Sequence, residues 1–455
     1  MKDSVSEYTL LIVESPTIAN RLRDIVPDYV YVFSTSGFLW KPIYNYKNGR
    51  LGRKAIQDKL EFRNELRREA RYAVHIIVAT DSDPSGDFIA WTIHKEFPSK
   101  SIKRTHISSL SYSSVLHRLK KAFTIDFSTL FIRLQNRYRI RHLWSEAYPE
   151  ISMKDAGLLA VFGGELALKT FLSDREVQYF SETSITVTLI STQISARQSS
   201  ETGWIISSPL STFDVISRLK RSTGLKTFSG AQALTQRTFE TIHPETGEGL
   251  ITYPRTEARS FYSDTWQGLQ NEWIKEKSLN EFLPEQLHTL TKPDKPHDSI
   301  RPLHLDVLPA WVESHLPAEI GQAYKIIYFH TLKSIRLPVA CSTVYKWGDE
   351  DLRFMTRSSI QCSKINLRPF LSVSELGYQL CKLGVLRPSG FGNFIDRAIK
   401  ENKISMNPSG EVIPNAGIKN RLHNGSKFSI ILKKLRDAAD DTELSDETIR
   451  RILTS

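Results

Sequence analysis

The chain has 455 residues, of which 40% are hydrophobic and 10% aromatic, so it can form several buried cores and is not a disordered chain. Lysine and arginine exceed aspartate and glutamate by 61 to 50, which favours a polyanionic partner without identifying it. Cys341, Cys362 and Cys381 form no C-x-x-C pair, so neither a zinc ribbon nor a disulfide framework is predicted.

Hydrophobic runs in the chain are short. None approaches the ~18 apolar residues of a membrane span. The first residues, MKDSVSEYTLLIVESP, lack the charged region and long apolar run of a signal peptide. We therefore expect no membrane association and a cytoplasmic location.

The N-terminal part alternates strand and helix patterns. Residues 9–13 (TLLIV) and 29–34 (YVYVFS) read as strands, and residues 74–80 (VHIIVAT) give the strongest strand signal in the chain. An acidic turn, DSDPSGD, and a helical segment at 88–97 follow. Strand, turn and helix in this order predict a parallel sheet, whose ligands lie at the carboxyl ends of the strands.

The rest of the chain mixes helical and strand patterns. A β region interrupts helical regions that then resume, which suggests a chain that leaves one domain and returns to it. The predicted stretches are helices at 112–172, antiparallel strands at 182–207, helix at 212–242, short strands at 335–368, helix, turn and helix at 373–404, and an acidic tail from Asp437 that ends in a short amphipathic helix.

Three acids form the first candidate site. Glu14 and Asp81 each follow a strand, and Asp83 lies two residues beyond Asp81. Carboxylates converging at one sheet edge can hold Mg²⁺, although D-S-D can equally be the N-cap of a helix. LIVESP followed by VATDSDPSGDFIAWTI resembles the TOPRIM domain of topoisomerases and primases. Ser85 stands where that family has a third acid, and Asp87 is the residue that could compensate.

The second candidate site is GEGLITYPRTEARSF, residues 247–261. A tyrosine hydroxyl needs a nearby cation to attack a phosphodiester, and Arg255 shares a face with Tyr253 if the segment is extended. A bare Y-x-R is usually an ordinary strand. The longer match resembles the active-site signature of type IA topoisomerases, which implies that Tyr253 is the nucleophile and Arg255 binds the phosphate. Glu257 stands for the usual Asp.

Two further segments extend this resemblance. PHDSIRP, residues 296–302, is similar to a family element that brings a histidine to the scissile phosphate, here His297 with Arg301 beside it. LRPSGFGNFI, within residues 383–404, resembles an element of the DNA groove that contains Arg387 and Ser389. Without the resemblance, the first is a surface loop bounded by prolines and the second a capped helix start.

Several family features are replaced in this sequence. Phe38 stands where a His is usual, SSLSY at 108–112 lacks the usual Asn-Glu-Ile-Thr, and Phe162 replaces an Arg that contacts DNA. Arg137, Arg139 and Arg141 on the preceding helix can position backbone phosphates instead, with Arg137 and Arg141 as the DNA-binding residues. No C-terminal zinc or basic repeat is present in the sequence.

The resemblance implies a fold and a division into domains. We expect a multidomain α/β plus α+β chain in which a TOPRIM parallel-sheet domain, helical domains and β-strand domains form a toroid around a DNA-sized hole. The expected parts are the TOPRIM domain at 1–125, a helical groove domain at 126–180 and 373–430, a β-strand hinge at 181–213 and 333–372, a catalytic-tyrosine domain at 214–332 and an acidic tail at 431–455.

The resemblance also implies an activity. A monomer would cut single-stranded segments of negatively supercoiled DNA through a 5′-phosphotyrosine, without ATP and with Mg²⁺ at Glu14, Asp81 and Asp83. Glu14, Arg255 and His297 would act with Tyr253 as catalytic residues. The protein would work near the nucleoid. Two alternatives stay open. One is a DNA-binding relative with a decayed metal site, and the other is a TOPRIM nuclease or primase, which would leave the Tyr253 segment unexplained.

Overall fold

The computed structural model describes a mixed α/β protein. The residues described are 8–81, 83–107, 109–163, 184–189, 192–199, 203–205, 208–261, 265, 268–269, 297–335, 339–341, 343–347, 352–356, 364–365, 371–408, 410–439 and 442–455. The predicted helical stretch at 157–172 therefore lies partly outside the described residues, as does much of the predicted β region.

The chain divides into two compact units, each made of segments that are distant in sequence. The first comprises Met1–Glu150, Phe239–Tyr253 and Lys434–Ser455, and the second comprises Ile151–Thr238 and Pro254–Lys433. One of the boundaries between the two units falls directly after Tyr253.

A five-stranded sheet of order β2-β1-β5-β6-β7 forms the centre of the first unit. Strands β1 (Tyr8–Val13), β2 (Val30–Ser34), β5 (Ala73–Val78) and β6 (Ile102–Arg104) are parallel, and β7 (Phe123–Thr124) is antiparallel to β6. Strands β1, β2 and β5 confirm the three strands predicted from the apolar runs. In β1 the residues Leu10 to Val13 are all buried, as expected of a parallel strand covered on both faces.

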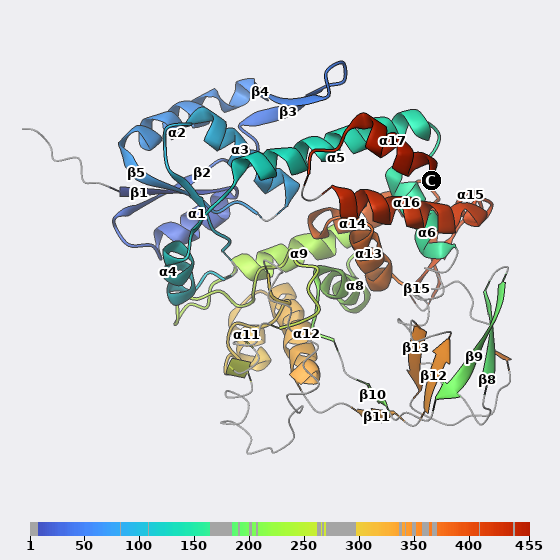
Figure 1. Cartoon of the computed structure of the whole chain (residues 1–455). Helices are drawn as coiled ribbons and strands as arrows, with labels where there is room; N and C mark the ends of the chain where they lie inside the picture. The colour runs from blue at the N-terminus through green and yellow to red at the C-terminus, as the bar shows by residue number, and fades with distance from the viewer. Residues whose placement is uncertain are drawn as a thin grey trace, which may run out of the picture. The chain divides into compact units, whose positions relative to one another are not determined.

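Helices cover this sheet. Figure 1 shows α1 (Pro16–Arg23) and α2 (Leu60–Tyr72) on opposite sides of it. Alternate residues of β1 explain this arrangement: Leu10 and Ile12 share one hydrophobic core with Leu66 of α2 and with Phe88 and Trp91 of α3 (Pro84–Glu96). Helices α4 (Tyr112–Lys120), α5 (Phe127–Ala147) and α17 (Asp446–Thr454) complete the unit.

A hairpin lies within residues 40–55, where the sequence analysis predicted no strand. Strands β3 (Trp40–Asn45) and β4 (Arg50–Ala55) pair antiparallel, and η1 (Gln57–Lys59) leads from β4 into α2. Burial alternates along β3, where Trp40 is buried and Pro42 and Tyr44 are half-buried, whereas the residues between them are exposed. Strand β4, RLGRKA, has a single large apolar residue, the buried Leu51, so its sequence lacks the alternating apolar pattern that identifies a half-buried strand.

The second unit contains most of the helices after residue 150. They are α6 (Met153–Phe162), α8 (Thr212–Ser222), α9 (Phe228–Glu240), α11 (Pro309–His315), α12 (Ala318–Ile335), α13 (Val373–Lys382), α14 (Phe391–Lys400), α15 (Ala416–Lys419) and α16 (Gly425–Ala438), with the turns η3 (Pro388–Gly390) and η4 (Leu422–Asn424). The ends of α9 and α16 belong to the first unit. No helix of the described part of the chain combines the length and apolarity that a membrane crossing needs.

Three small sheets belong to the same unit. One has the order β13-β12-β9-β8-β14, from β8 (Ser184–Leu189), β9 (Thr192–Ser199), β12 (Thr343–Trp347), β13 (Leu352–Thr356) and β14 (Lys364–Ile365). The others are β10 (Gly203–Ile205) with β11 (Val339–Cys341), and β15 (Leu371–Ser372) with β17 (Glu411–Pro414) and β16 (Ile404–Met406). Within the described part of the predicted range 182–207, β8 and β9 pair antiparallel as expected. Strands β16 and β17 form a further antiparallel pair.

Candidate active site

The predicted carboxylates lie at the carboxyl edge of the parallel sheet. Glu14 follows β1 directly, and its carbonyl oxygen accepts a hydrogen bond of 3.1 Å from the Ser34 hydroxyl at the end of β2. Asp81 follows β5 after two further residues. The first turn of α3 packs closely on it: a Cβ at Gly86 would lie 2.0 Å from the Asp81 carbonyl oxygen, so this position requires glycine.

Asp83 caps helix α3. Its Oδ1 accepts hydrogen bonds of 2.9 Å from the backbone amides of both Ser85 and Gly86. Asp83 is therefore the N-cap of α3, as the alternative interpretation of D-S-D predicted. It accepts hydrogen bonds from two amides that have no partner within the helix. One of its carboxylate oxygens is engaged in this way.

Asp87 is paired with a buried cation that the sequence did not single out. Arg104, only 3% exposed, forms an ion pair with the Asp87 carboxylate, and its Nη2 donates to the Asp81 carbonyl oxygen at 2.8 Å. Arg104 ends β6 opposite Val78 at the same edge of the sheet. Strand β6 has the sequence IKR, which carries no apolar run, so no sequence signal marks Arg104 as a residue of this edge.

These contacts test whether the edge fits a magnesium ion. Oxygen ligands are what Mg²⁺ prefers, and Glu14, Asp81 and Asp83 supply them. However, no group of three or more acidic, histidine or cysteine side chains in the described ranges is close enough to hold a metal ion. The carboxylates thus fit a cation only in part, as a site that needs a further ligand such as a substrate phosphate.

Tyr253 ends a tight hairpin-like segment. Gly247, at a φ of 69°, donates its amide to the His243 carbonyl oxygen at 2.9 Å, and Ile242 bridges Gly249. Tyr253 is buried and meets Phe239 edge to face, with ring centroids 5.7 Å apart. The compact unit that contains the carboxylate edge also contains residues 239–253.

The segment after Tyr253 is held by hydrogen bonds to Thr212 rather than by strand pairing. Thr212 donates its amide to the Thr256 carbonyl oxygen at 2.9 Å, and its hydroxyl lies 2.7 Å from the Pro254 carbonyl oxygen. The Thr256 amide donates back to the Thr212 hydroxyl at 2.8 Å. Residues 252–260 are not part of a strand, so Tyr253 and the half-buried Arg255 do not share the face of a strand.

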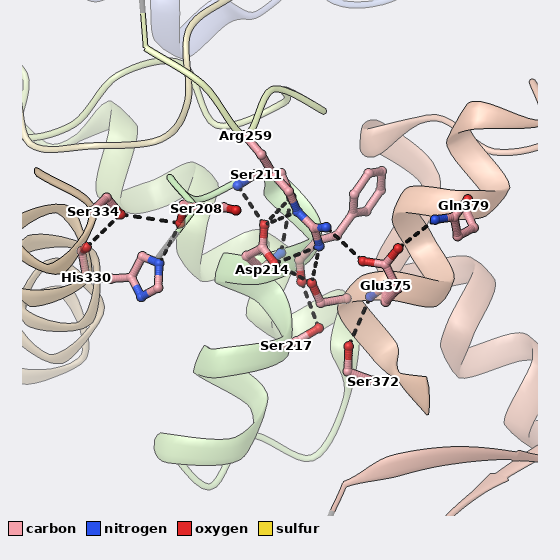
Figure 2. Close-up of polar contacts among 12 residues, drawn as sticks. Ser208, Ser211, Asp214, Ser217, Arg259, His330, Ser334, Ser372, Glu375 and Gln379 are labelled. Atoms are coloured by element: carbon pink, nitrogen blue, oxygen red, sulfur yellow. Dashed lines mark hydrogen bonds and ion pairs between the residues drawn. The ribbon is translucent and has the colours of Figure 1, made fainter. Parts of the chain in front are cut away.

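Arg259 fastens this segment to two helices (Figure 2). Its Nε and Nη2 bind the two oxygens of Asp214 at 3.0 Å each, and its Nη1 binds Glu375 at 2.8 Å. Burial opposes the charge of Asp214, yet Arg259 holds the pKa of that carboxyl below its ordinary value. Burial likewise opposes the charge of Arg259, but the two carboxylates raise its pKa.

Neither Arg259 nor its partners figured among the predicted site residues. Asp214 also closes a capping box with Ser211, because the Ser211 hydroxyl accepts from the Asp214 amide at 3.4 Å and the Ser211 amide donates to Asp214 Oδ2 at 2.9 Å. The spacing Ser211-x-x-Asp214 before an apolar run is the sequence signal that could have located this helix start.

The PHDSIRP segment lies against the residues that follow Tyr253. The Ser299 amide donates to the Ser260 carbonyl oxygen at 3.2 Å, and the Ile300 amide donates to the Leu210 carbonyl oxygen at 2.7 Å. The structure thus brings together, within the second unit, two segments that the sequence separates by about forty residues. His297 and Asp298 are buried here, and burial raises the pKa of Asp298 despite the opposing charge of Arg301.

The comparisons with known proteins agree with this geometry. Residues 9–110 match the Toprim domain family. The fold is similar to that of full-length topoisomerase I from Thermotoga maritima, with a TM-score of 0.65 and 16% sequence identity, over 98% of this chain and 89% of that one. The chain contains a Toprim domain and has a topoisomerase I fold. No curated protein matches the chain by sequence.

Within this topoisomerase fold, the predicted groove element starts differently from expectation. Pro388–Gly390 forms a 3-10 turn and α14 begins at Phe391, and neither start has a side-chain cap. Ser389 therefore is not the helix cap that the sequence suggested. Its carbonyl oxygen instead accepts a 2.6 Å bond from Gln232, whose Oε1 accepts from the Gly392 amide at 2.8 Å, so the turn is fixed against α9.

The predicted basic residues have unequal surroundings. Arg141 on α5 is exposed and Arg137 is half-buried, whereas Arg139 is buried and donates to the backbone carbonyl oxygens of Gly49 and Leu444. Arg139 thus has a structural role and does not present its charge to DNA, contrary to the expectation for it. In the second unit, Arg387 is exposed.

Arg301 is partly engaged within its own segment. Its Nη1 donates to the Pro302 carbonyl oxygen at 2.9 Å, and its Nε lies 3.4 Å from Asp298 Oδ2. These contacts hold the guanidinium against its own segment.

Proposed function

We propose that the chain is a type IA DNA topoisomerase with Tyr253 as its nucleophile. One observation carries this proposal: a topoisomerase I fold extends over 98% of the chain and contains the segment GLITYPRT in the family's order after a Toprim domain. A nuclease or primase with the same Toprim domain would have no use for that segment.

The proposed chemistry is a reversible transesterification. The phenolic oxygen of Tyr253 attacks a phosphodiester and becomes bonded to the 5′ phosphate, while the 3′ oxygen leaves and takes up a proton. Arg255 can bind two phosphate oxygens, and His297 can donate to one, so both stabilise the charge of the transition state. Attack by the 3′ hydroxyl reverses the bond. The phosphotyrosine conserves the energy of the cut bond, so ATP is not required.

Mg²⁺ is the proposed cofactor, with Glu14, Asp81 and Asp83 as its protein ligands. A magnesium ion often takes only one or two carboxylates and completes its shell with water and substrate phosphate, which suits a site that lacks a closed set of protein ligands. Bound there, the ion would neutralise phosphate charge and hold the DNA ends. Glu14 would serve both as a ligand and as a catalytic residue.

The proposed substrate is a single-stranded segment of negatively supercoiled DNA. Its phosphates would contact Arg137, Arg141, Arg301 and Arg387, with Ser389 nearby, because long cationic side chains position a backbone without reading its sequence. We propose that a monomer acts near the nucleoid, with its domains arranged as a toroid through which the second strand passes.

A Tyr253→Phe variant tests the proposal. Wild-type protein should relax negatively supercoiled plasmid DNA and form a covalent adduct with a single-stranded oligonucleotide, and the variant should do neither. Because Tyr253 packs edge to face on Phe239, removing only its hydroxyl should preserve the fold, which circular dichroism can check. Relaxation that survives the substitution would refute the assignment.

The second candidate is a DNA-binding relative with a decayed metal site. Two observations favour it: Ser85 replaces an acid, and Asp87 is already paired with Arg104. Such a protein would bind DNA but relax none of it, with or without Mg²⁺. The same plasmid assay therefore separates the two functions.

A further inference from the structure

The β3–β4 hairpin is rigidly attached to the first unit. Arg53 donates to the Thr92 carbonyl oxygen at 2.7 Å and pairs with Glu96 at 2.9 Å, which binds β4 to α3. At the tip, Arg139 donates to the Gly49 carbonyl oxygen at 3.1 Å. Gly49 has a φ of 63°, and a Cβ there would lie 3.0 Å from Arg139 Nη2. Glycine is therefore needed for both the turn and the contact.

Aromatic rings connect the hairpin to helix α5. Tyr44 of β3 is stacked on Tyr138 of α5 with centroids 6.0 Å apart, and Tyr46 at the tip meets Tyr44 edge to face at 5.4 Å. Tyr46 also lies 4.5 Å from the ring of His142. Although its ring is positioned by these neighbours, Tyr46 is 65% exposed. An oriented ring left in solvent is a stacking surface without a described partner on its open side.

The same hairpin is strongly basic. Residues 40–55 contain five lysines and arginines and no acidic residue. Lys41, Lys47, Arg50 and Lys54 are exposed, and within the described ranges none of the four forms an ion pair. Arg141 of α5 lies one helical turn from Tyr138 and is also exposed.

The acidic residues around this surface are already engaged. Glu443 and Asp446 both pair with the buried Arg139, and Glu146 pairs with His142. The exposed charge that remains on the hairpin is therefore positive. Figure 1 shows the hairpin beside α3 and α5.

We propose that the β3–β4 hairpin and the adjoining face of α5 bind single-stranded DNA. Tyr46 stacks on an unpaired base, and Lys47 and Arg50 bind the flanking phosphates. Exposed aromatic rings set among cations are the features by which proteins hold unpaired strands, because every base offers a stacking face and every phosphate a charge. A duplex would satisfy the cations but hide its bases from Tyr46. The inference rests on this surface alone and does not depend on Tyr253 chemistry.

The test measures binding of the full-length chain to a fluorescent single-stranded oligothymidylate and to a duplex by fluorescence anisotropy. Tyr46→Ala should weaken single-strand binding roughly fivefold or more, because one stacked base is lost, and should leave duplex binding unchanged. Replacing Lys47 and Arg50 by Gln should lower the slope of log affinity against log salt by about 1.4, since two phosphate contacts are lost.

Matched control variants come from helix α4 of the same unit. Tyr112 is exposed, as are Lys120 and Lys121, so Tyr112→Ala and the Lys120→Gln, Lys121→Gln pair remove equivalent groups elsewhere. These variants should bind like wild type. The proposal is overturned if Tyr46→Ala binds the single strand as tightly as wild type, or weakens single-strand and duplex binding equally.

The same samples separate this proposal from the proposed function. The Tyr46→Ala variant should still form the Tyr253 adduct at saturating DNA, because the hydroxyl of Tyr253 and the guanidinium of Arg255 are unchanged in it. A wild-type chain that forms no adduct but loses affinity on Tyr46→Ala would support the hairpin surface and refute the topoisomerase activity.

Discussion

Arg259 and Asp214 form a two-pronged ion pair, with Nε–Oδ2 and Nη2–Oδ1 both at 3.0 Å, at the point where the segment after Tyr253 meets helix α8. The guanidinium also binds Glu375 and stacks over the Tyr378 ring at 4.3 Å. One cation thus joins the segment after Tyr253 to α8 and α13.

Arg259→Ala should destabilise the second unit strongly. It leaves two buried carboxylates, Asp214 and Glu375, without their cation, and such a loss typically costs about 3–5 kcal/mol. Urea unfolding measures the change. The control is Lys325→Ala, which breaks an ion pair of 3.0 Å with Glu313 whose side chains are 49% and 35% exposed. That change should cost less than about 1 kcal/mol. Equal effects of the two substitutions would show that the Arg259 network adds no stability.

Asp214 and Asp298 should respond to pH in opposite ways. Arg259 holds the pKa of Asp214 below its ordinary 3.8, so ionised Asp214 stabilises the fold above that value and the stabilisation is lost as pH falls through the depressed pKa. Burial raises the pKa of Asp298, so protonation of Asp298 stabilises the fold as pH falls.

The corresponding variants test these signs. At neutral pH, Asp214→Asn should lower the free energy of unfolding more than Asp298→Asn does. On acidification, the stability of Asp214→Asn should rise relative to wild type, whereas that of Asp298→Asn should fall. Unfolding curves recorded from neutral pH to below the ordinary carboxyl pKa give the free energy of unfolding of each variant relative to wild type. If these two relative stabilities change in the same direction on acidification, the assigned pKa shifts are wrong.

Substitution of the acids at the sheet edge should separate ligands from structural residues. Asp87 is paired with Arg104, so Asp87→Asn should leave the magnesium dependence of plasmid relaxation nearly unchanged. Asp81→Asn should raise the Mg²⁺ concentration needed for half-maximal relaxation, because it removes a proposed ligand. Melting temperatures of both variants control for stability. A shift with Asp87→Asn as large as that with Asp81→Asn would place Asp87 in the metal site, as the sequence allowed.

The sheet was predictable from sequence because its strands are buried on both faces. Residues Leu10 to Val13 and Ile76 to Val78 are continuous apolar runs, and the acids that follow them lie at the carboxyl edge that parallel strands share. The β3–β4 hairpin was not predictable in this way. It is held against the unit by Arg53 and Arg139, whose contacts join residues that are distant in sequence.

The roles of single charged residues depended on tertiary partners. The sequence offered Asp83 as ligand or cap, and the amides of Ser85 and Gly86 show that it caps α3. Asp87 and Arg139 looked available for metal and DNA, yet each is paired inside the fold. Ser389 looked like a helix cap, but the chain makes a 3-10 turn first. Local patterns contain none of these long-range pairings.

The most direct test of the central claim is to identify the residue that becomes linked to DNA. Wild-type protein is incubated with a short single-stranded oligonucleotide, the adduct is trapped and digested, and the DNA-bearing peptide is sequenced by mass spectrometry. We expect a peptide in which Tyr253 is bonded to a 5′ phosphate. Linkage through another residue, linkage to a 3′ phosphate, or no adduct under conditions where the protein relaxes plasmid DNA would contradict it.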